Sequence, residues 1–230
     1  MTDIRAELET IHAELADIQA GLAAVAVRVL ALSLMVDDSF VDKPLPPITK
    51  GILNVQYLSQ WDRPDADDRP GDCGPACVAM LARFLTTSNP TVDEAATACG
   101  QPTTGRGKWT TGFNHLETGA KFYGITLDYR RPLDIVTLCD FIDDGKPSIA
   151  LINYGVLGEY LDNQDTYEGG HWVLVVGYDG ENIIIHDPDW KDDRRAEGAF
   201  RHIPRTVYDL AAGTPKKGYF SKGWQGLVVT

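Results

Sequence analysis

The stretch "GDCGPACVAMLARF", residues 71 to 84, places a cysteine where an apolar helix begins. After Cys73 the apolar residues recur at helical spacing, at Cys77, Val78, Met80, Leu81 and Phe84. Gly74 and Pro75 suit a tight entry and a first helical turn, where a missing N–H group costs little. Cys73 is therefore expected at or just before the helix N-terminus, where unpaired amides and the helix dipole favour a thiolate over a thiol.

The other cysteines do not indicate a disulfide-rich protein. Four cysteines in 230 residues are too few for a dense framework, and a reduced compartment is the simplest interpretation. Cys77, one turn along the same helix, is expected in the core. Cys73 itself could also be a buried structural cysteine, which is the commonest fate of a free cysteine. The stretch alone leaves its role open between chemistry and packing.

Length and charge limit the class of protein. A chain of 230 residues is long enough for one sizeable core, or for a core with an appendage. The formal net charge is −12, and no run of Lys and Arg occurs. Binding to phosphate groups needs clustered cations, so neither nucleic acid nor an anionic membrane surface is expected as the main partner.

The first residues lack the features of a targeting or spanning segment. The start "MTDIRAELETIHAEL" is acidic and amphipathic, without the basic region and cleavage site of a signal peptide. The most apolar window, residues 20–36, is short for a membrane span and carries Arg28 in its middle. We expect no membrane span, and the location stays open between the cytoplasm and a phage or virion particle.

Residues 1–36 carry a heptad repeat. The a positions are Leu8, Leu15, Leu22, Val29 and Val36, and the d positions are Ile4, Ile11, Ile18, Val25 and Leu32. Leucine at a with isoleucine at d disfavours a parallel dimer and favours trimers or tetramers. We expect an N-terminal coiled-coil helix that forms a homo-oligomer, a tetramer first and a trimer second. The alternative is a single amphipathic helix folded onto its own domain.

A linker and a globular domain follow the heptads. Residues 37–51 contain three prolines and no periodicity, which indicates a linker. Within residues 52–230, helical patterns begin at Cys73 and at the capping-box pair Thr91 and Glu94, and cover about 111–123 and 133–143. Strand patterns cover 52–58, 147–155, 171–178, 182–188 and 225–230. This order predicts an α+β fold with a helical part packed on an antiparallel sheet.

The stretch "GGHWVLVVGYDGENIIIHDPDW", residues 169 to 190, predicts a hairpin. Asp179-Gly180 between two apolar runs is a strong turn signal. His171 opens the first strand and Asp187 closes the second. With a three-residue loop over 179–181, Val173 pairs with Asp187, and His171 and Asp187 share a face as diagonal neighbours. A two-residue loop would place them on opposite faces, so the prediction depends on register.

Together, "VQYLSQWD", "GDCGPACVAML" and "GGHWVLVVGYDGENIIIHDP" resemble the bacteriocin-processing, double-glycine type of cysteine peptidase and its stand-alone relatives. The resemblance covers roughly residues 52–230 and implies a papain-like fold. It implies that Cys73 is the nucleophile, that His171 is the base and that Asp187 orients this base. It also implies that Gln60 contributes to the oxyanion hole.

Two features depart from the family pattern. The insertion "DRPDADDRP", residues 62–70, lengthens the spacing between Gln60 and Cys73, which puts the placement of Gln60 in question. Membrane segments of a transporter are missing, so export-linked cleavage of leader peptides does not carry over. The substrate is expected to be a peptide or a protein.

The expected chemistry is amide hydrolysis by a Cys-His-Asp triad. Cys73 attacks as a thiolate beside the His171 imidazolium, and Asp187 holds the Nδ1–H tautomer. The Gln60 side chain and the Cys73 backbone N–H receive the oxyanion. Two alternatives keep the same scaffold: an acyl transferase of the transglutaminase-like kind, and a non-catalytic oligomeric binding or structural protein.

No cofactor or metal is expected. A site formed by Cys73, Cys77 and His171 lacks a clear fourth ligand. The acidic loop 62–72 lacks the spaced ligands of a calcium site and is interpreted as solvated. Alternation along the strand points His186 to the face opposite Asp187. The remaining histidines are expected to be structural or at the surface: His12, His115 and His202.

Overall fold

The structure is a computed structural model that describes residues 51–62, 71–101, 111–161, 167–214 and 223–230. The predicted coiled-coil helix of residues 1–36 and nearly all of the linker, residues 37–51, lie outside the described residues. Most of the acidic loop 62–72 also lies outside them. The described residues therefore belong almost entirely to the predicted globular domain.

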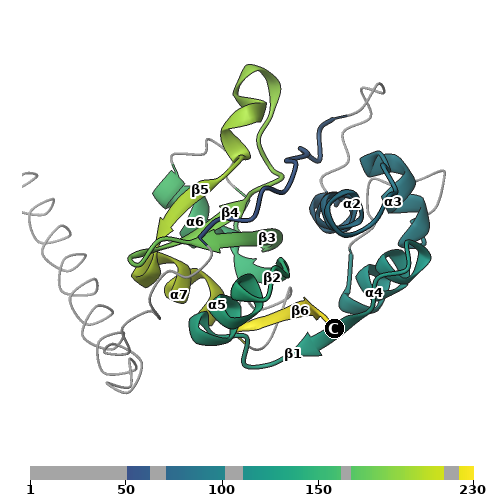
Figure 1. Cartoon of the computed structure of the whole chain (residues 1–230). Helices are drawn as coiled ribbons and strands as arrows, with labels where there is room; N and C mark the ends of the chain where they lie inside the picture. The colour runs from purple at the N-terminus through teal and green to yellow at the C-terminus, as the bar shows by residue number, and fades with distance from the viewer. Residues whose placement is uncertain (1–50, 63–70, 102–110, 162–166, 215–222) are drawn as a thin grey trace, which may run out of the picture. The chain divides into compact units, whose positions relative to one another are not determined.

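A single antiparallel sheet forms the centre of this domain (Figure 1). Its strands follow the order β1 (Leu127–Arg130), β6 (Gln225–Val229), β2 (Ser148–Asn153), β3 (Gly170–Tyr178), β4 (Asn182–His186) and β5 (Arg201–Pro204). Every neighbouring pair is antiparallel. The strands predicted from the four later apolar runs are confirmed, whereas β1 and β5 carried too weak a pattern to be predicted.

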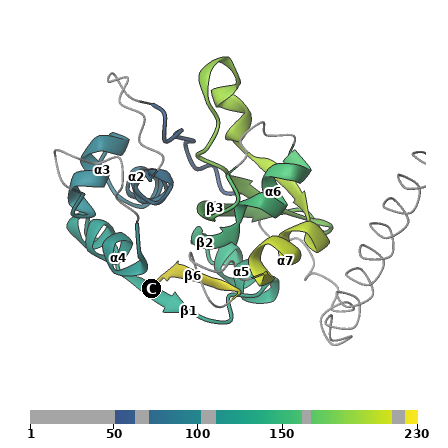
Figure 2. The same ribbon diagram turned by 180° about the vertical axis from the view of Figure 1, so that it is seen from behind.

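Helices cover both faces of the sheet, as Figures 1 and 2 show. One face is packed by α2 (Cys73–Leu85), α3 (Val92–Ala98) and α4 (Phe113–Phe122). The other is packed by α5 (Ile135–Asp143), α6 (Tyr154–Leu161) and α7 (Arg205–Gly213). A short 3-10 helix, η2 (Asp192–Gly198), links β4 to β5. The predicted α+β fold is confirmed.

The central strand β3 explains why its sequence is continuously apolar. Trp172 and Leu174 pack into the core beneath α2, whereas Val173 and Val175 pack into the core on the opposite face. A strand that is buried on both faces has no solvent side on which polar residues could alternate. Burying each such side chain contributes about 1.5–3 kcal/mol, so β3 anchors both helical layers.

The helices α2 and α3 begin where the local signals predict, whereas α6 and α7 were not predicted. Cys73 is the first residue of α2, and Pro75 lies in its first turn, where the backbone needs no donor. Gly74 allows close packing, because a Cβ atom there would lie 2.8 Å from the side chains of Thr111 and Leu116. At α3 the predicted capping box is present in full: Glu94 bonds the backbone of Thr91, whose hydroxyl accepts from the Glu94 backbone.

Residues 52–58 differ from their prediction. They form no strand, and only Ile52 makes an isolated bridge, to Gly177. The reason is that β2 pairs with the same edge of β3 that Ile52 contacts, and this pairing extends as far as Val175. Only the last residues of β3 are left on this edge for residues 52–58 to pair with.

All four cysteines lie in the described part of the chain, and each is buried and free. Among the described helices, none combines the length and the apolar character that crossing a membrane requires.

Candidate active site

Cys73 lies at the point where α2 meets the sheet. The N-terminus of α2 carries Asp72 as its N-cap, and the Asp72 Oδ1 atom accepts a hydrogen bond of 2.7 Å from the Gln101 side chain. The Cys73 side chain is 7% exposed. It is therefore sheltered but sits at the helix terminus, where unpaired amides favour an anion.

His171, near the start of β3, is the partner of Cys73. Its imidazole forms a side-chain hydrogen bond with Cys73 and a second one, of 2.7 Å from Nε2, with Oδ1 of Asp187. Burial by itself lowers the pKa of His171, but Asp187 and Cys73 outweigh it and raise that pKa well above its ordinary value. The site thus favours an imidazolium beside the Asp187 carboxylate.

Asp187 is fully buried, and its carboxylate accepts four hydrogen bonds. Its Oδ1 atom accepts from His171 and from the backbone N–H of Asp189 (3.0 Å). Its Oδ2 atom accepts from the Trp190 indole (3.0 Å) and the Tyr154 hydroxyl (3.2 Å). Burial raises the pKa of Asp187, but His171 and these donors lower it below its ordinary value, so the carboxylate stays ionised.

The tautomer predicted for His171 is wrong. Asp187 bonds Nε2, not Nδ1, and the Nδ1 atom is left for Cys73. Strand pairing could predict that the carboxylate reaches the ring. It could not predict which edge of the ring faces it, because that depends on the side from which α2 brings the thiol.

The loop of the β3–β4 hairpin is shorter than predicted. The backbone N–H of Asp179 donates to the carbonyl of Asn182 at 3.2 Å, which leaves only residues 180–181 at the centre of the turn. The predicted three-residue loop is therefore wrong. With this loop and an unbroken ladder, His171 and Asp187 would lie on opposite faces.

A β-bulge restores their shared face. The register of β3 against β4 shifts by one residue at Val176. Beyond the bulge Leu174 pairs with His186, so that the next residue, Asp187, lies on the same face as His171. The predicted meeting of the two side chains is found, by a different route.

Contacts from the beginning of the domain hold the bulge. The Leu53 N–H donates to the carbonyl of Val176 (2.8 Å), and Ile52 bridges Gly177. A Cβ atom at Gly177 would lie only 3.0 Å from the Cα atom of Ile52, so this approach requires a glycine.

Two buried aromatic residues complete the surroundings of the imidazole, and sequence reasoning missed both. The Tyr154 ring packs on His171 with centroids 4.3 Å apart, and its hydroxyl bonds Asp187. Trp190 donates to the same carboxylate. The position of Trp190, three residues after Asp187, was a usable signal. Tyr154 has none, because it reaches the site only through the β2–β3 pairing.

Gln60 is buried beside the segment that follows Asp187. Its backbone N–H donates to the carbonyl of Pro188, and its side-chain Nε2 donates to Oδ1 of Asp189, both at 3.0 Å. The insertion 62–70 therefore does not separate Gln60 from the segment that holds the imidazole. Cys73, His171 and Asp187 form one connected group, and Gln60 joins it through residues 188–189.

Comparison with known proteins decides the family. A protein-family model described as the "Peptidase_C39 like family" matches residues 52–210. This chain belongs to that family. No curated protein matches the chain significantly.

Solved structures similar to this C39-like chain include a protein from Bacillus anthracis described as a C39-like peptidase. It has 19% identity and a TM-score of 0.54, and the match covers 80% of this chain and 98% of that one. Another is a double-glycine-motif protease from an AMS/PCAT transporter in complex with the leader peptide, with 17% identity, coverage of 80% and 96%, and a TM-score of 0.46. A third is the peptidase domain of Streptococcus ComA, with 20% identity, coverage of 73% and 93%, and a TM-score of 0.45. Family and fold together support a cysteine peptidase.

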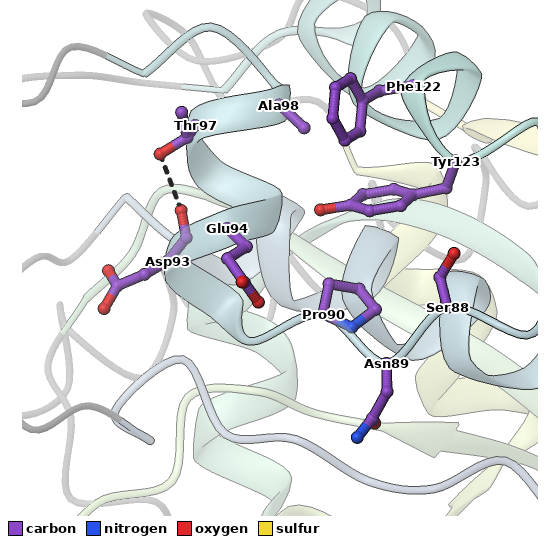
Figure 3. A pocket seen from close by; sticks show the side chains of 9 residues that line it. All are labelled: Ser88, Asn89, Pro90, Asp93, Glu94, Thr97, Ala98, Phe122 and Tyr123. Atoms are coloured by element: carbon purple, nitrogen blue, oxygen red, sulfur yellow. Dashed lines mark hydrogen bonds between the residues drawn. The ribbon is translucent and has the colours of Figure 1, made fainter.

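This C39-like domain has a cavity of about 680 Å³, whose lining residues Figure 3 shows. Its walls come from residues 88–90, from α3 and from the end of α4. At the end of α4 the rings of Phe122 and Tyr123 meet edge to face with centroids 5.1 Å apart. None of the four predicted site residues lines it. It is a separate feature of the surface.

His186 points away from Asp187, as strand alternation predicts. Its Nδ1 atom accepts from the backbone N–H of Phe200 (3.0 Å), so the ring is neutral and Nε2 donates to the carbonyl of Val55 (2.9 Å). Burial lowers the pKa of His186 to about 4. The ring holds residues 55 and 200 together and does not face the triad.

This arrangement predicts a loss of stability in mild acid. The unfolded chain binds a proton at His186 near its ordinary pKa of 6.5, whereas the folded chain resists until about 4. The contribution of His186 to the free energy of unfolding should therefore fall as the pH drops through this window, by about 2–3 kcal/mol between pH 7.5 and 4.5. Urea unfolding at several pH values would measure it. His186→Gln keeps a donor but does not titrate, so it should lack this contribution, and the native chain should lose stability relative to the variant as the pH falls. Equal slopes in the two chains would contradict the prediction.

The other predicted structural residues behave as such. Cys77 is fully buried in the core, and burial raises its pKa well above the ordinary value. His115 accepts from the backbone of Gly112 at the start of α4, and His202 pairs with Asp179 at the surface. Within the described ranges, no group of three or more potential ligands is arranged to hold a metal ion.

Proposed function

We propose that this C39-like chain is a cysteine peptidase or amide hydrolase in which Cys73 is the nucleophile. His171 is the general base and acid, and Asp187 orients it. The observation that carries the proposal is the buried 2.7 Å bond between His171 Nε2 and Asp187 Oδ1, on an imidazole that also bonds Cys73. A structural cysteine in the core would need neither partner.

In the proposed reaction the Cys73 thiolate attacks the carbonyl carbon of a peptide bond, and a carbon–sulfur bond forms. The tetrahedral intermediate collapses as the C–N bond breaks and the His171 Nδ1–H protonates the leaving amine. His171 then takes a proton from water as the water attacks the thioester. The C–S bond breaks, the acid is released, and the Cys73 thiolate returns beside the His171 imidazolium. Throughout, Asp187 holds Nε2–H and stabilises the imidazolium.

The oxyanion in this proposal is received by the backbone N–H of Cys73 and the side-chain amide of Gln60. The first belongs to the unpaired amides of the α2 N-terminus. Losing one such donor typically costs roughly 3–4 kcal/mol of transition-state stabilisation. The proposed substrate is a peptide or a protein.

Alkylation with iodoacetamide at pH 6 tests the nucleophile. Cys73 should react at this pH, where an ordinary thiol is mostly protonated, because His171 stabilises the thiolate. Cys99 and Cys139 serve as internal controls, since burial raises the pKa of each to about 12. Peptide mapping by mass spectrometry would read all sites at once.

The matched variant is His171→Gln, which should remove the labelling of Cys73 at pH 6. If Cys73 is not labelled in the native chain, or is labelled to the same extent in the variant, the result counts against the thiolate–imidazolium pair. Product analysis of a cleaved peptide pool, with and without an added amine, would then separate hydrolysis from acyl transfer.

We also propose the organisation expected from the heptads: a coiled-coil helix over residues 1–36, a linker over 37–51 and the peptidase domain over 52–230. The full chain should then be a tetramer, or else a trimer, by light scattering at micromolar concentration. Charged residues in the seam, as in Leu15→Asp with Leu22→Asp, should yield monomers. A native chain that is already monomeric would refute the coiled coil.

A further inference from the structure

The segment Asp187–Trp190 contacts both halves of the proposed machinery. Asp187 bonds the base, while the carbonyl of Pro188 accepts from the backbone N–H of Gln60 at 3.0 Å. Ser59 reinforces this junction, because its hydroxyl lies 2.8 Å from the carbonyl of Trp190 and 3.2 Å from that of Pro188. Residues 59–60 are thereby tied to the segment that holds the imidazole.

Asp189 carries a buried carboxylate in this segment that the mechanism does not use. It is 6% exposed. Its Oδ1 atom accepts from Nε2 of Gln60 at 3.0 Å and from the indole N–H of Trp61 at 2.9 Å. The backbone N–H of Asp189 donates to Asp187 Oδ1. The same residue therefore bonds Gln60 with its carboxylate and the Asp187 carboxylate with its backbone.

The contact decides which way the Gln60 amide points. An amide has a donor end and an acceptor end, and a carboxylate only accepts. Nε2 must therefore face Asp189, and the reversed amide would set two oxygens against each other. The Oε1 atom of Gln60 is buried and has no hydrogen-bond partner among the described residues. No described residue bonds the amide on that side, and Asp189 is the side chain that orients it through Nε2.

We propose that Asp189 is a positioning residue that acts through Gln60. It takes one N–H of the Gln60 amide and fixes the group so that the second N–H is available to an oxyanion. This inference rests on the proposed function and deepens it: Asp187 orients the base, and Asp189, two residues later, orients the oxyanion donor.

The role requires the acceptor atom and not the negative charge. A carboxylate close to a developing oxyanion repels it, so the charge alone would slow the reaction. An asparagine can present Oδ1 to both Gln60 and Trp61, and Asp189→Asn should keep the amide in place. Asp189→Ala removes the acceptor and should release it.

Two reactions of Cys73 separate positioning from damage to the fold. Acylation by p-nitrophenyl acetate passes through a tetrahedral oxyanion, whereas alkylation by iodoacetamide displaces iodide and forms none. We would measure both rates in the native chain, Asp189→Ala, Asp189→Asn, Gln60→Ala and the double variant Gln60→Ala/Asp189→Ala. Thermal melts would verify folding.

In Gln60→Ala, acylation should fall about tenfold, less than the 10²–10³ typical of an amide substrate, because the leaving group is activated. The acylation rate of Asp189→Ala should fall by about the same factor. The rate of the double variant should be no lower than that of Gln60→Ala. Asp189→Asn should stay within about threefold of the native rate, and alkylation should be unchanged throughout.

The inference is overturned if Asp189→Ala is acylated at the native rate. It is also overturned if the losses of the two single variants multiply in the double variant, or if alkylation falls in parallel with acylation. If only Asp189→Ala leaves acylation unchanged, the proposed function stands and this inference fails. If Gln60→Ala also leaves it unchanged, the oxyanion assignment fails as well. Should Asp189→Ala not fold, Asp189→Glu, which displaces the acceptor by one methylene group, should show the same selective loss.

Discussion

Replacing Cys73 with alanine is expected to reduce amide hydrolysis to background while the domain stays folded. The sulfur forms the covalent bond to the substrate, and no neighbouring group can replace it. Removing the nucleophile of a comparable triad costs on the order of 10⁶-fold in kcat. Alanine suits the first turn of α2, so the helix should form as before. Hydrolysis of a peptide pool, read by mass spectrometry beside circular dichroism, would measure the effect.

Cys77→Ala is the matched control, because it removes a thiol one turn along the same helix. Cys77 is fully buried in the core, so this variant should lose about 1 kcal/mol of stability and keep its activity. Full activity in Cys73→Ala, or loss in both variants alike, would show that Cys73 is not the nucleophile.

Exchanging Asp187 for asparagine is expected to damage both catalysis and stability. The carboxylate accepts four hydrogen bonds, two at each oxygen. An asparagine must present its NH₂ group to one of these pairs. If the NH₂ group faces His171, it favours the tautomer without a proton on Nε2. If it faces Trp190, it places an amide N–H group against the indole N–H.

The expected magnitudes are large. The catalytic efficiency, kcat/KM, should fall by roughly 10³- to 10⁴-fold. Stability should fall by about 3 kcal/mol or more, because the charged partner of a buried imidazolium is lost. Since the pKa of Asp187 is lowered by folding, its stabilising effect is present at neutral pH and is lost only in strong acid. Urea unfolding at pH 7 would therefore show the full difference.

Asp179→Asn is the matched exchange at the surface, where Asp179 pairs with His202. Asparagine before Gly180 suits the same turn, so activity and stability should change little. Native activity in Asp187→Asn, or an equal effect of the two exchanges, would contradict the role given to Asp187.

Local patterns in the sequence were enough to predict the elements that carry the site. The start of α2 at Cys73, the capping box at Thr91 and the buried run of β3 each depend on neighbours a few residues away. Such signals are readable because propensity, capping and burial act over one or two turns. The heptads of residues 1–36 are a signal of the same kind, and their oligomer stays a prediction.

Tertiary structure decided how these elements meet. The sequence predicted a three-residue loop that would place His171 and Asp187 on one face. The loop in the structure has two residues and would by itself part them, and the bulge at Val176 brings them together. That bulge is held by Leu53, more than a hundred residues away along the chain. Likewise Tyr154 reaches the imidazole only through the pairing of β2 with β3. Local sequence encodes strands and helix ends; the faces they share depend on long-range contacts, which have no signature in any short stretch.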